Sequence, residues 1–338
     1  MKLIALKDVC KINMGQSPNS SSYNDYGDGM PFFQGNADFG ERYPITRVWC
    51  NTPTKIAQAE DILISVRAPI GALNYAKEEC CIGRGLAAIT PDRNKVSQDF
   101  IYWALKGKKA ELNDKGNGST FKAISRKVLE ETMIPDINFE QQHKCAENLE
   151  KIYGIIQNRR KELLALDDLI KARFVEMFGD PIINSKHLET KELKDILILK
   201  AGDFTAASDI ADEPSEFNPY PCYGGNGIRG YVVEYNQEGE YSLVGRQGAL
   251  SGNVQFASGK FKNTEHALLV TPIVEMNCIW LNQLLVNLDL KRYQTGAAQP
   301  GLSVKNLQEI KILCVSIDEQ KAFADFVRQV DKSKFVVI

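Results

Sequence analysis

Several classes of protein are excluded by what this sequence lacks. No run approaches the roughly 18 apolar residues of a membrane span, and no charged leader precedes an apolar segment at the start of the chain. The eight cysteines include no C-x-x-C pair, and only Cys80 and Cys81 lie close in sequence. This spacing argues against a zinc site and against a disulfide framework. We therefore expect a cytoplasmic protein with reduced thiols, no bound metal and no membrane partner.

Recognisable catalytic motifs are also missing. The histidines are scattered, and the chain contains no H-E-x-x-H, G-x-S-x-G or P-loop. Asn218-Pro219-Tyr220 resembles the N-P-P-[FYW] motif of adenine methyltransferases but lacks the second proline, and no glycine-rich cofactor loop stands upstream of it on a strand. We therefore predict that the chain has no catalytic residues and binds no cofactor of its own.

One glycine-rich segment matches a nucleotide-binding motif in its letters alone. Residues Gly225 to Gly230 spell G-x-G-x-x-G, but a dinucleotide site needs a strand before this motif and a helix after it. A strand-like segment, 231–235, follows instead. A hairpin or a glycine-rich turn is the better interpretation.

The charge of the chain gives no strong sign of a partner. The formal net charge is −2. By segment it is +2 over residues 1–138, −1 over 139–180 and −3 over 181–317, and residues 318–338 are balanced. A nucleic-acid-binding protein with these charges must gather its basic side chains on one face.

What the sequence does contain is an internal repeat. Leu6-Lys7-Asp8-Val9 recurs as Leu193-Lys194-Asp195-Ile196, and Pro31-x-Phe33-x-Gly35-Asn36 recurs as Pro221-x-Tyr223-x-Gly225-Asn226. Further matches follow in the same order: Arg67, Asn74, Thr90-Pro91 and the segment 124–142 correspond to Arg246, Asn253, Thr271-Pro272 and the segment 302–320. The offsets range from 178 to 190, so only loop lengths differ. Matches kept in order over a whole domain indicate duplication.

Each copy is expected to be a mixed αβ domain. Short β-rich runs at 61–66, 86–89, 230–235, 241–244 and 267–270 are divided by Gly, Asn, Asp and Pro. Helices are expected at about 98–113 and 278–288. The predicted fold is α+β, or mixed αβ, with two repeated strand-rich domains separated by a long coiled-coil-type helix. The predicted boundaries are 1–138 for the first domain, 139–180 for the long helix, 181–317 for the second domain and 318–338 for a short second helix.

Residues from about Phe139 to Phe178 predict one long helix with an apolar seam. The segment contains no proline and one glycine, and Gly179-Asp180-Pro181 would end the helix. Apolar side chains recur at heptad positions, namely Leu149, Ile152, Ile156, Leu163, Leu166, Ile170 and Met177. Either the helix packs along one domain or this seam has a partner helix. The second helix places Val327 and Val330 at the equivalents of Leu149 and Ile152, but it is too short to cover the whole seam, so we expect another chain to cover most of it.

The order of domain, long helix, domain and helix resembles the specificity (S) subunit of type I restriction–modification systems, over nearly the whole chain. The similar segments occupy the same place in both copies. They are the opening Leu-Lys-Asp-Val/Ile, the segments 66–71 and 244–249 (Val-Arg-Ala-Pro-Ile-Gly and Val-Gly-Arg-Gln-Gly-Ala), and the segments 118–142 and 299–320 that lead into the helices.

The resemblance implies a division of labour between subunits. Each domain would be a target-recognition domain that reads one half of a bipartite site in double-stranded DNA, and the helices would fix the distance between the halves. The helices would also dock methyltransferase (modification) subunits, which carry S-adenosylmethionine, and a restriction subunit would supply nuclease activity. This chain would be a non-catalytic specificity subunit. Its second helix departs from the family pattern by being short, so self-association through the uncovered seam is a further expectation.

Polar and basic loop residues are the candidates for contact with DNA. Lysine, arginine and hydroxyl groups hold phosphates, whereas arginine pairs with guanine, and asparagine or glutamine with adenine. In the first domain the phosphate candidates, which cluster around residues 116–120, are Lys106, Lys108, Lys109, Lys115, Thr120 and Lys122, and the base candidates are Gln34, Asn36, Arg67 and Arg84. In the second domain the candidates are Asn226, Arg229, Arg246, Gln247, His266, Arg292, Gln294 and Gln299. A residue kept in both copies cannot explain two different half-sites, so Arg67, Arg246, Asn36 and Asn226 have an equal claim to a structural role.

An adaptor that joins protein partners through its helix seam and binds no DNA is the alternative. The −3 charge of the second copy favours it. Charge reversal at Lys108, Lys109, Lys115 and Lys122 together would separate the two hypotheses, because an adaptor would keep its function.

Overall fold

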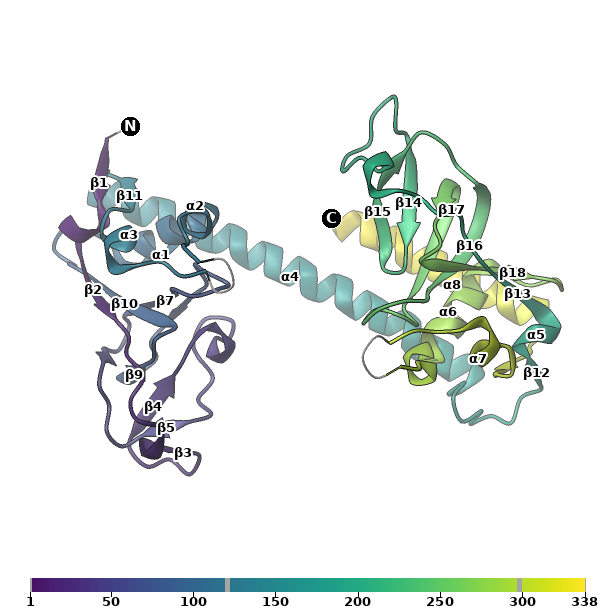
Figure 1. The fold of residues 1–338 in the computed structure, drawn as a ribbon, viewed down its shortest axis with the longest axis horizontal. Helices are drawn as coiled ribbons and strands as arrows, with labels where there is room; N and C mark the ends of the chain where they lie inside the picture. The colour runs from purple at the N-terminus through teal and green to yellow at the C-terminus, as the bar shows by residue number, and fades with distance from the viewer. Residues whose placement is uncertain (1, 119–121, 297–299, 338) are drawn as a thin grey trace. The chain divides into compact units, whose positions relative to one another are not determined.

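The computed structural model describes residues 2–118, 122–296 and 300–337. The chain divides into two compact units, residues 1–156 and 157–338, and the division lies within the long helix. Each unit holds one copy of the repeat and one part of that helix (Figure 1). The mixed αβ class and the two repeated strand-rich domains are confirmed.

The first domain is built mainly of short strands. They are β1 (Leu3–Ala5), β2 (Cys10–Met14), β3 (Tyr23–Asn24), β4 (Met30–Phe33), β5 (Trp49–Cys50), β6 (Ile56–Ala57), β7 (Ile62–Ser65), β8 (Leu73–Tyr75), β9 (Cys80–Ile82), β10 (Leu86–Pro91) and β11 (Met133–Pro135). Within the described residues one sheet has the order β2-β10-β7-β8 and a second has the order β3-β5-β4-β9-β6, while β1 pairs with β11.

Both faces of the first of these sheets are covered, as the alternation of side chains on β7 shows. Ile62 and Ile64 pack into a core with residues of the long helix and of three shorter helices, and Leu63 faces a second cluster with Phe33 and Ile82. The shorter helices are α1 (Gln98–Gly107), α2 (Lys109–Asp114) and α3 (Arg126–Glu130). The single helix predicted at 98–113 is thus broken at Lys108, which follows Gly107 and has φ −92° and ψ 4°, because glycine is a weak helix former.

The second domain repeats this plan with longer strands. They are β12 (Thr190–Glu192), β13 (Leu197–Ala201), β14 (Tyr220–Gly224), β15 (Gly227–Val232), β16 (Gln237–Gly245), β17 (Val254–Asn263), β18 (Ala267–Pro272) and β19 (Lys311–Leu313), and the short helices are α5 (Leu193–Ile196), α6 (Cys278–Asn287) and α7 (Val304–Gln308). Its main sheet has the order β13-β18-β16-β17-β14-β15. The glycine-rich segment 225–230 forms the β14–β15 hairpin, so the hairpin interpretation is confirmed.

The duplication extends to single hydrogen bonds. The buried Gln142 accepts a hydrogen bond from Ser97 N (2.7 Å) and donates one to Ile137 O (2.8 Å). The buried Gln320 makes the equivalent pair with Asn277 N (2.8 Å) and Val315 O (3.0 Å). Each glutamine ties the start of its domain's terminal helix to the segment that precedes α1 or α6.

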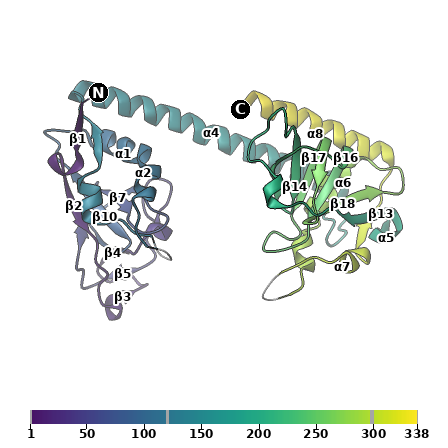
Figure 2. The ribbon, with the colours of Figure 1, turned by 45° about the horizontal axis from the view of Figure 1, so that its top comes forward.

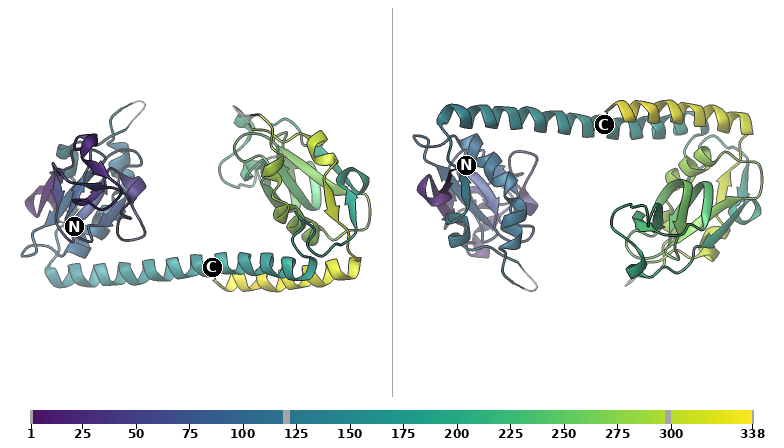
Figure 3. Two further views of the ribbon diagram at one scale, coloured as in Figure 1. Left: turned by 90° about the horizontal axis from the view of Figure 1, so that it is seen from below. Right: turned by 90° about the horizontal axis from the view of Figure 1, so that it is seen from above.

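The long helix α4 spans Phe139–Phe178, as predicted, and ends at Gly179, which has φ +78°. The second long helix, α8 (Ile317–Val337), agrees with the predicted 318–338 to within one residue at each end. Within the second unit α8 lies beside the C-terminal part of α4 (Figure 3). Helix α6 contacts α8 and strands β16 and β17, all of which belong to the second domain (Figure 2). Among the described helices, none combines the length and the apolar character needed to cross a membrane.

The contacts between α4 and α8 show that the two helices are antiparallel. Lys334 pairs with Asp167 at 2.7 Å, whereas Phe323, near the start of α8, stacks edge-on against Phe174 at 5.5 Å and Phe178 at 5.7 Å. Residue numbers therefore rise in opposite directions along the two helices. The buried Val327 and Val330 belong to the same core.

This packing decides which part of the predicted seam is covered within the chain. Ile170 is buried, and Leu166 and Met177 pack against the same core as α8. Leu163 is half-buried. Leu149, Ile152 and Ile156 are 41%, 53% and 43% exposed. We expected most of the seam to lack a partner within the chain. In the structure α8 covers the C-terminal half of the seam, so only the part around Leu149, Ile152 and Ile156 is left exposed among the predicted positions.

Candidate nucleic-acid interface

In each domain a segment before a short helix is closed at its two ends by a pair of backbone hydrogen bonds. In the first domain Asn117 and Ala123 exchange two backbone hydrogen bonds of 3.0 Å, and in the second Thr295 and Gly301 exchange two of 2.9 Å. We call residues 117–123 and 295–301 the first and second return loops. Two candidates from the sequence, Thr120 and Gln299, lie outside the described residues.

Each return loop is tied by backbone hydrogen bonds to the segment that follows a central strand. In the first domain Ile124 N donates to Val66 O (2.9 Å) and Ala68 N donates to Lys122 O (3.1 Å). In the second domain the equivalent bonds run from Leu302 N to Arg246 O (2.8 Å) and from Gly248 N to Pro300 O (2.9 Å). The same frame therefore follows β7 and β16.

These bonds correct the alignment of the two copies. Val66 and Arg246 occupy the same place in the frame, and the next residues, Arg67 and Gln247, bridge to Ala123 and Gly301 respectively. The match of Arg67 with Arg246 was therefore one residue out of register. The match of Asn74 with Asn253 is also wrong, because the carbonyl equivalent to that of Asn253 belongs to Ala72.

In each domain one side-chain amide donates a hydrogen bond to the segment that follows the central strand. Asn113 Nδ2 donates to Ile70 O at 2.9 Å, and Gln294 Nε2 donates to Ser251 O at 2.6 Å. The neighbouring Gly71 and Gly252 have φ +83° and +84°, a conformation that L residues with a side chain rarely adopt. The amide NH₂ group of Gln294 thus fixes the segment between β16 and β17, to which Ser251 belongs.

Three base-reading candidates of the first domain come together around Gly85. Gly85 N donates to Gln34 O (3.0 Å), and Gly85 O accepts from Val66 N (2.8 Å), next to Arg67. Ser17 Oγ links Gln34 Oε1 (3.0 Å) to the backbone of Arg84 (3.2 Å). The side chains of Gln34, Arg67 and Arg84 are all exposed, whereas Asn36 is half-buried at the start of a short 3-10 helix, Asn36–Asp38.

The second domain gathers its own polar cluster on the equivalent frame. Arg246 N donates to His266 O (3.1 Å), and His266 Nδ1 lies 3.1 Å from Gln247 Oε1. Asn253 Nδ2 donates to Asn226 Oδ1 at 2.8 Å. A cavity of about 330 Å³ adjoins this cluster and is lined by Arg246, Gln247, Thr295, Pro300, Gly301, Leu302 and Ser303.

Two further arginine candidates of the second domain are exposed. Arg229 lies on β15, the second strand of the glycine-rich hairpin. Arg292 lies in a 3-10 turn, Leu290–Tyr293, with its guanidinium 5.2 Å from the centre of the Tyr293 ring. That turn directly precedes the braced end of the second return loop.

The lysines predicted to surround residues 116–120 have different surroundings. Lys108 and Lys115 both pair with Glu111 at 2.6 Å, and their hydrogen bonds lower the pKa of that carboxyl group. Lys109 and Lys122 are exposed, and Lys122 adjoins the end of the first return loop.

Lys106 points into a cluster of aromatic rings instead of toward the loop. Its Nζ lies 3.6 Å from the ring centre of Tyr153 on α4, 4.6 Å from Trp103 and 5.5 Å from Tyr102. Burial lowers the pKa of Lys106. Such cation–π contacts hold α4 against α1, so the grouping of Lys106 with the loop lysines is wrong. The i, i+3 and i+4 spacing of Tyr102, Trp103 and Lys106 could have indicated one shared helix face.

One contact between the first domain and α4 has no signal in the sequence. Arg42 pairs with Glu150 at 2.6 Å, and its guanidinium lies 5.1 Å from the Tyr75 ring centre. The two partners are 108 positions apart, so no local pattern joins them.

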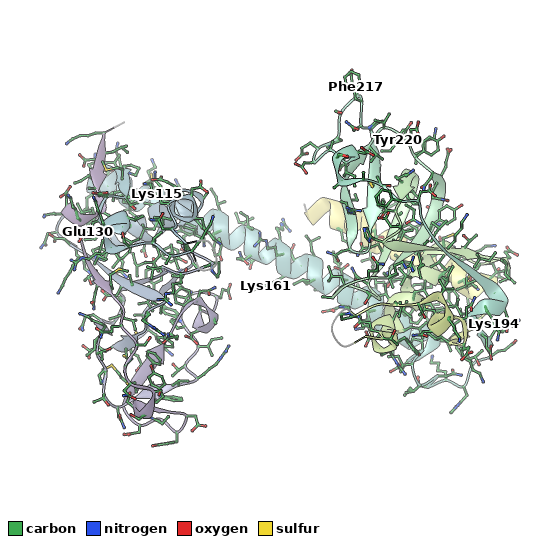
Figure 4. All side chains as sticks on the ribbon, viewed as in Figure 1. Lys115, Glu130, Lys161, Lys194, Phe217 and Tyr220 are labelled. Atoms are coloured by element: carbon green, nitrogen blue, oxygen red, sulfur yellow. The ribbon has the colours of Figure 1, made fainter. Side chains whose placement is uncertain are left out.

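Five of the acidic residues of the second domain lie on one loop. The loop before β14 carries Asp203, Asp209, Asp212, Glu213 and Glu216. Figure 4 shows Phe217 at the tip of this loop and Tyr220 where β14 begins, and Phe217 is 82% exposed. In Figure 1 the tip of this loop lies at the opposite end of the domain from the ends of the second return loop, whereas its start, at Asp203, accepts a hydrogen bond from Glu265 N (3.2 Å). The return-loop face carries a carboxylate of its own, because Glu265 Oε1 lies 3.1 Å from His266 Nε2.

The described residues include no group of three or more His, Cys, Asp or Glu side chains arranged to hold a metal ion.

Comparisons with known proteins agree on one family. A family model described as the type I restriction modification DNA specificity domain matches residues 1–166 and 185–335. A specificity subunit assigned to the type I restriction enzyme MjaX of Methanocaldococcus jannaschii is 47% identical over 152 residues, which cover 45% of this chain and 36% of that protein. The EcoprrI type I restriction enzyme specificity subunit of Escherichia coli is 42% identical over 147 residues, covering 42% and 37%. These matches span little more than a third of each relative's length.

A solved structure extends the likeness of fold to nearly the whole chain. The crystal structure of the type I restriction–modification system S subunit from M. genitalium covers 99% of this chain and 90% of that chain, with a TM-score of 0.62 and 18% sequence identity. At that identity the match concerns the fold alone.

Proposed function

The chain belongs to the family of type I restriction–modification DNA specificity domains, and on that premise we propose that it is the sequence-specific DNA-binding subunit of a type I restriction–modification complex. Each repeated domain reads one half of a bipartite site in double-stranded DNA. The observation that carries this proposal is the return-loop frame, which recurs in both domains and presents exposed polar side chains in each.

The chain itself is proposed to be a non-catalytic, cytoplasmic subunit. Methyl transfer from S-adenosylmethionine belongs to modification subunits that dock on α4 and α8, and cleavage belongs to a restriction subunit. The domain boundaries are proposed as 1–138 and 181–317, with 139–180 and 318–338 as the spacer helices. These spacers set the separation of the two half-sites.

The candidate contacts divide by chemistry. Exposed Lys109 and Lys122 in the first domain, and Arg229 and Arg292 in the second, are proposed to contact phosphates, which are the same at every position of DNA. Base edges are proposed to be read by the groups beside the return loops, namely Gln34, Arg67, Arg84, Asn226, Gln247 and His266. Lys108 and Lys115 contribute less because Glu111 offsets their charge.

An adaptor that binds no DNA is supported mainly by the −3 charge of the second domain. Three of its acidic residues, Asp212, Glu213 and Glu216, precede Phe217 on the loop before β14, whose tip lies away from the ends of the return loop. Glu265, in contrast, adjoins His266. Part of the negative charge therefore lies away from the return-loop face, and the net charge alone does not decide between the two hypotheses.

The decisive experiment is co-expression with a cognate modification subunit, followed by sequencing that maps methylated adenine in the host DNA. We expect one split motif. Exchange of residues 181–317 for those of another specificity subunit should change one half of the motif and leave the other half as it was. A stable complex that methylates no defined motif, or a motif indifferent to the exchange, would overturn the proposal and favour the adaptor.

A further inference from the structure

One exposed position is held by the same backbone frame in both domains but carries different side chains. It is Arg67 in the first domain and Gln247 in the second, each following a central strand and each bridged to the end of its return loop. A fixed backbone with an exchanged side chain is the arrangement expected of a residue that distinguishes one half-site from the other.

The frame fixes the backbone on both sides of this position. The preceding residue donates through its N–H to Gly85 O (2.8 Å) in the first domain and to His266 O (3.1 Å) in the second. The following residue donates to Lys122 O (3.1 Å) or Pro300 O (2.9 Å). Because both neighbours are bonded alike, a difference in what the two positions bind must come from the side chains.

Arg67 is available for an external partner. Its side chain is exposed, and within the described part of the chain it forms no ion pair and no side-chain hydrogen bond. A guanidinium presents paired donors in one plane, which match O6 and N7 of guanine in the major groove.

Gln247 is exposed as well, but its amide group is held in one orientation by His266. Its Oε1 lies 3.1 Å from His266 Nδ1, and the other ring nitrogen of His266 lies 3.1 Å from Glu265 Oε1. With Oε1 held on the histidine side, Nε2 remains as a donor and Oε1 keeps a second lone pair. That pair of groups matches N7 and the N6 amino group of adenine.

We propose that Arg67 reads a guanine in the first half-site and Gln247 reads an adenine at the equivalent place in the second. The proposal rests on the function proposed above and names the residue in each domain that carries this difference. His266 is a positioning residue for Gln247. A phosphate contact explains the pair less well, because phosphates are alike in both half-sites and a neutral amide cannot replace a cation in neutralising them.

The test exchanges the two side chains in the complete complex with its modification subunit and maps the methylated motif. Arg67→Gln should replace guanine by adenine at one position of one half-site, and Gln247→Arg should make the reverse change in the other half. A good bidentate contact discriminates between bases by roughly 5- to 150-fold, which is the expected change in preference at that position alone. His266→Ala should weaken the adenine preference without altering the other half-site.

Matched controls carry the same substitutions on other surfaces of the same domains. Arg93→Gln removes an exposed arginine that pairs with Glu60, and Gln308→Arg adds one at the exposed end of α7. Both should leave the motif unchanged.

Selection of bound sequences from a randomised duplex library gives a second readout if methylation by a variant is slow. An unchanged motif in both Arg67→Gln and Gln247→Arg, with binding intact, would overturn this inference while leaving the proposed function standing. Loss of preference at every position together, in place of a change at one, would also overturn it. The absence of any split motif in the unaltered protein would instead refute the proposed function.

Discussion

At the scale of single residues, Lys109 and Lys122 stand out among the lysines predicted to surround residues 116–120, because both are exposed and neither forms one of the ion pairs with Glu111. Reversal of both charges, Lys109→Glu with Lys122→Glu, should weaken binding of the complex to DNA of any sequence. The slope of log affinity against log salt is negative, and each phosphate that the protein no longer neutralises reduces its magnitude by about one. We therefore expect the magnitude of the slope to fall by about two. Titration of labelled duplex DNA at several salt concentrations measures this.

The control for this pair is Lys127→Glu, an exposed lysine on α3 in the same domain. It should leave the slope within error of the unaltered protein. Equal effects of the control and of the double variant would mean that overall charge, and not these two positions, governs binding.

Gln320 offers a test of stability at the same scale. Removal of its amide in Gln320→Ala leaves Asn277 N–H and Val315 C=O without their partners, and such groups cost about 1–3 kcal/mol each when buried. We expect the free energy of unfolding, measured in urea, to fall by about 2 kcal/mol or more. Gln329→Ala, on the exposed face of the same helix, should change it by less than about 0.5 kcal/mol. Similar values for the two variants would contradict the role given to Gln320.

The candidate site was predictable from the sequence in its types of residue but not in its register. Matching letters pairs Arg67 with Arg246, and only the backbone hydrogen bonds show that Gln247 is the equivalent residue. Loop-length changes of one or two residues are invisible to such matching when the flanking residues are not alike. The prediction that Lys106 contacts phosphate with the loop lysines was wrong for another reason. Nearness in sequence to a loop does not show on which face of α1 a side chain lies.

At the scale of elements, the packing of α4 on α8 is carried by aromatic side chains. Phe174 is fully buried, 5.1 Å from the Phe178 ring and 5.5 Å from the Phe323 ring. Phe174→Ala should lower the free energy of unfolding of the second unit by about 3–5 kcal/mol because it leaves a cavity among these rings. The neighbouring Val175→Ala removes a side chain that is 42% exposed and should have little effect. Equal losses in urea denaturation would show that the aromatic contact is not what holds the helices together.

Elements with strong local signals were predicted almost to the residue. Residues 139–178 carry a continuous heptad pattern that ends at Gly179 and Pro181, and α4 has those bounds. The break between α1 and α2 was missed because one glycine, Gly107, weakens a helix without always ending it. The pairing of α8 with the C-terminal half of α4 depends on contacts between residues more than 140 positions apart, such as Phe178 and Phe323, which heptads in one helix do not reveal.

At the scale of the whole molecule, duplication accounts for both what the domains share and where they differ. The glutamines 142 and 320 and the return-loop frames are kept, because each domain must hold its loop and its helix in the same way. The positions that differ, such as Arg67 and Gln247, are exposed and therefore cost little in stability when exchanged. The same scaffold can thus present two different sets of side chains.

The last consequence concerns the exposed part of the helix seam. Leu149 and Ile152 correspond by the repeat to Val327 and Val330, which are 4% and 6% exposed because α4 covers them. We propose that the seam around Ile152 and Ile156 is covered by the same segment of a second copy, in a two-fold arrangement that makes each copy's seam contact the other's. Sedimentation of the isolated chain should then show a dimer that dissociates on dilution.

Ile152→Glu with Ile156→Glu should abolish this dimer, because four carboxylates would be brought together in an apolar contact. Leu169→Glu alters another exposed apolar side chain on a different face of α4 and should leave the dimer intact. A monomer at every concentration of the unaltered chain would refute self-association. In that case loss of modification-subunit binding by the double variant would assign this part of the seam to that subunit, since an exposed apolar stripe of this length on one helix face marks a site of protein contact.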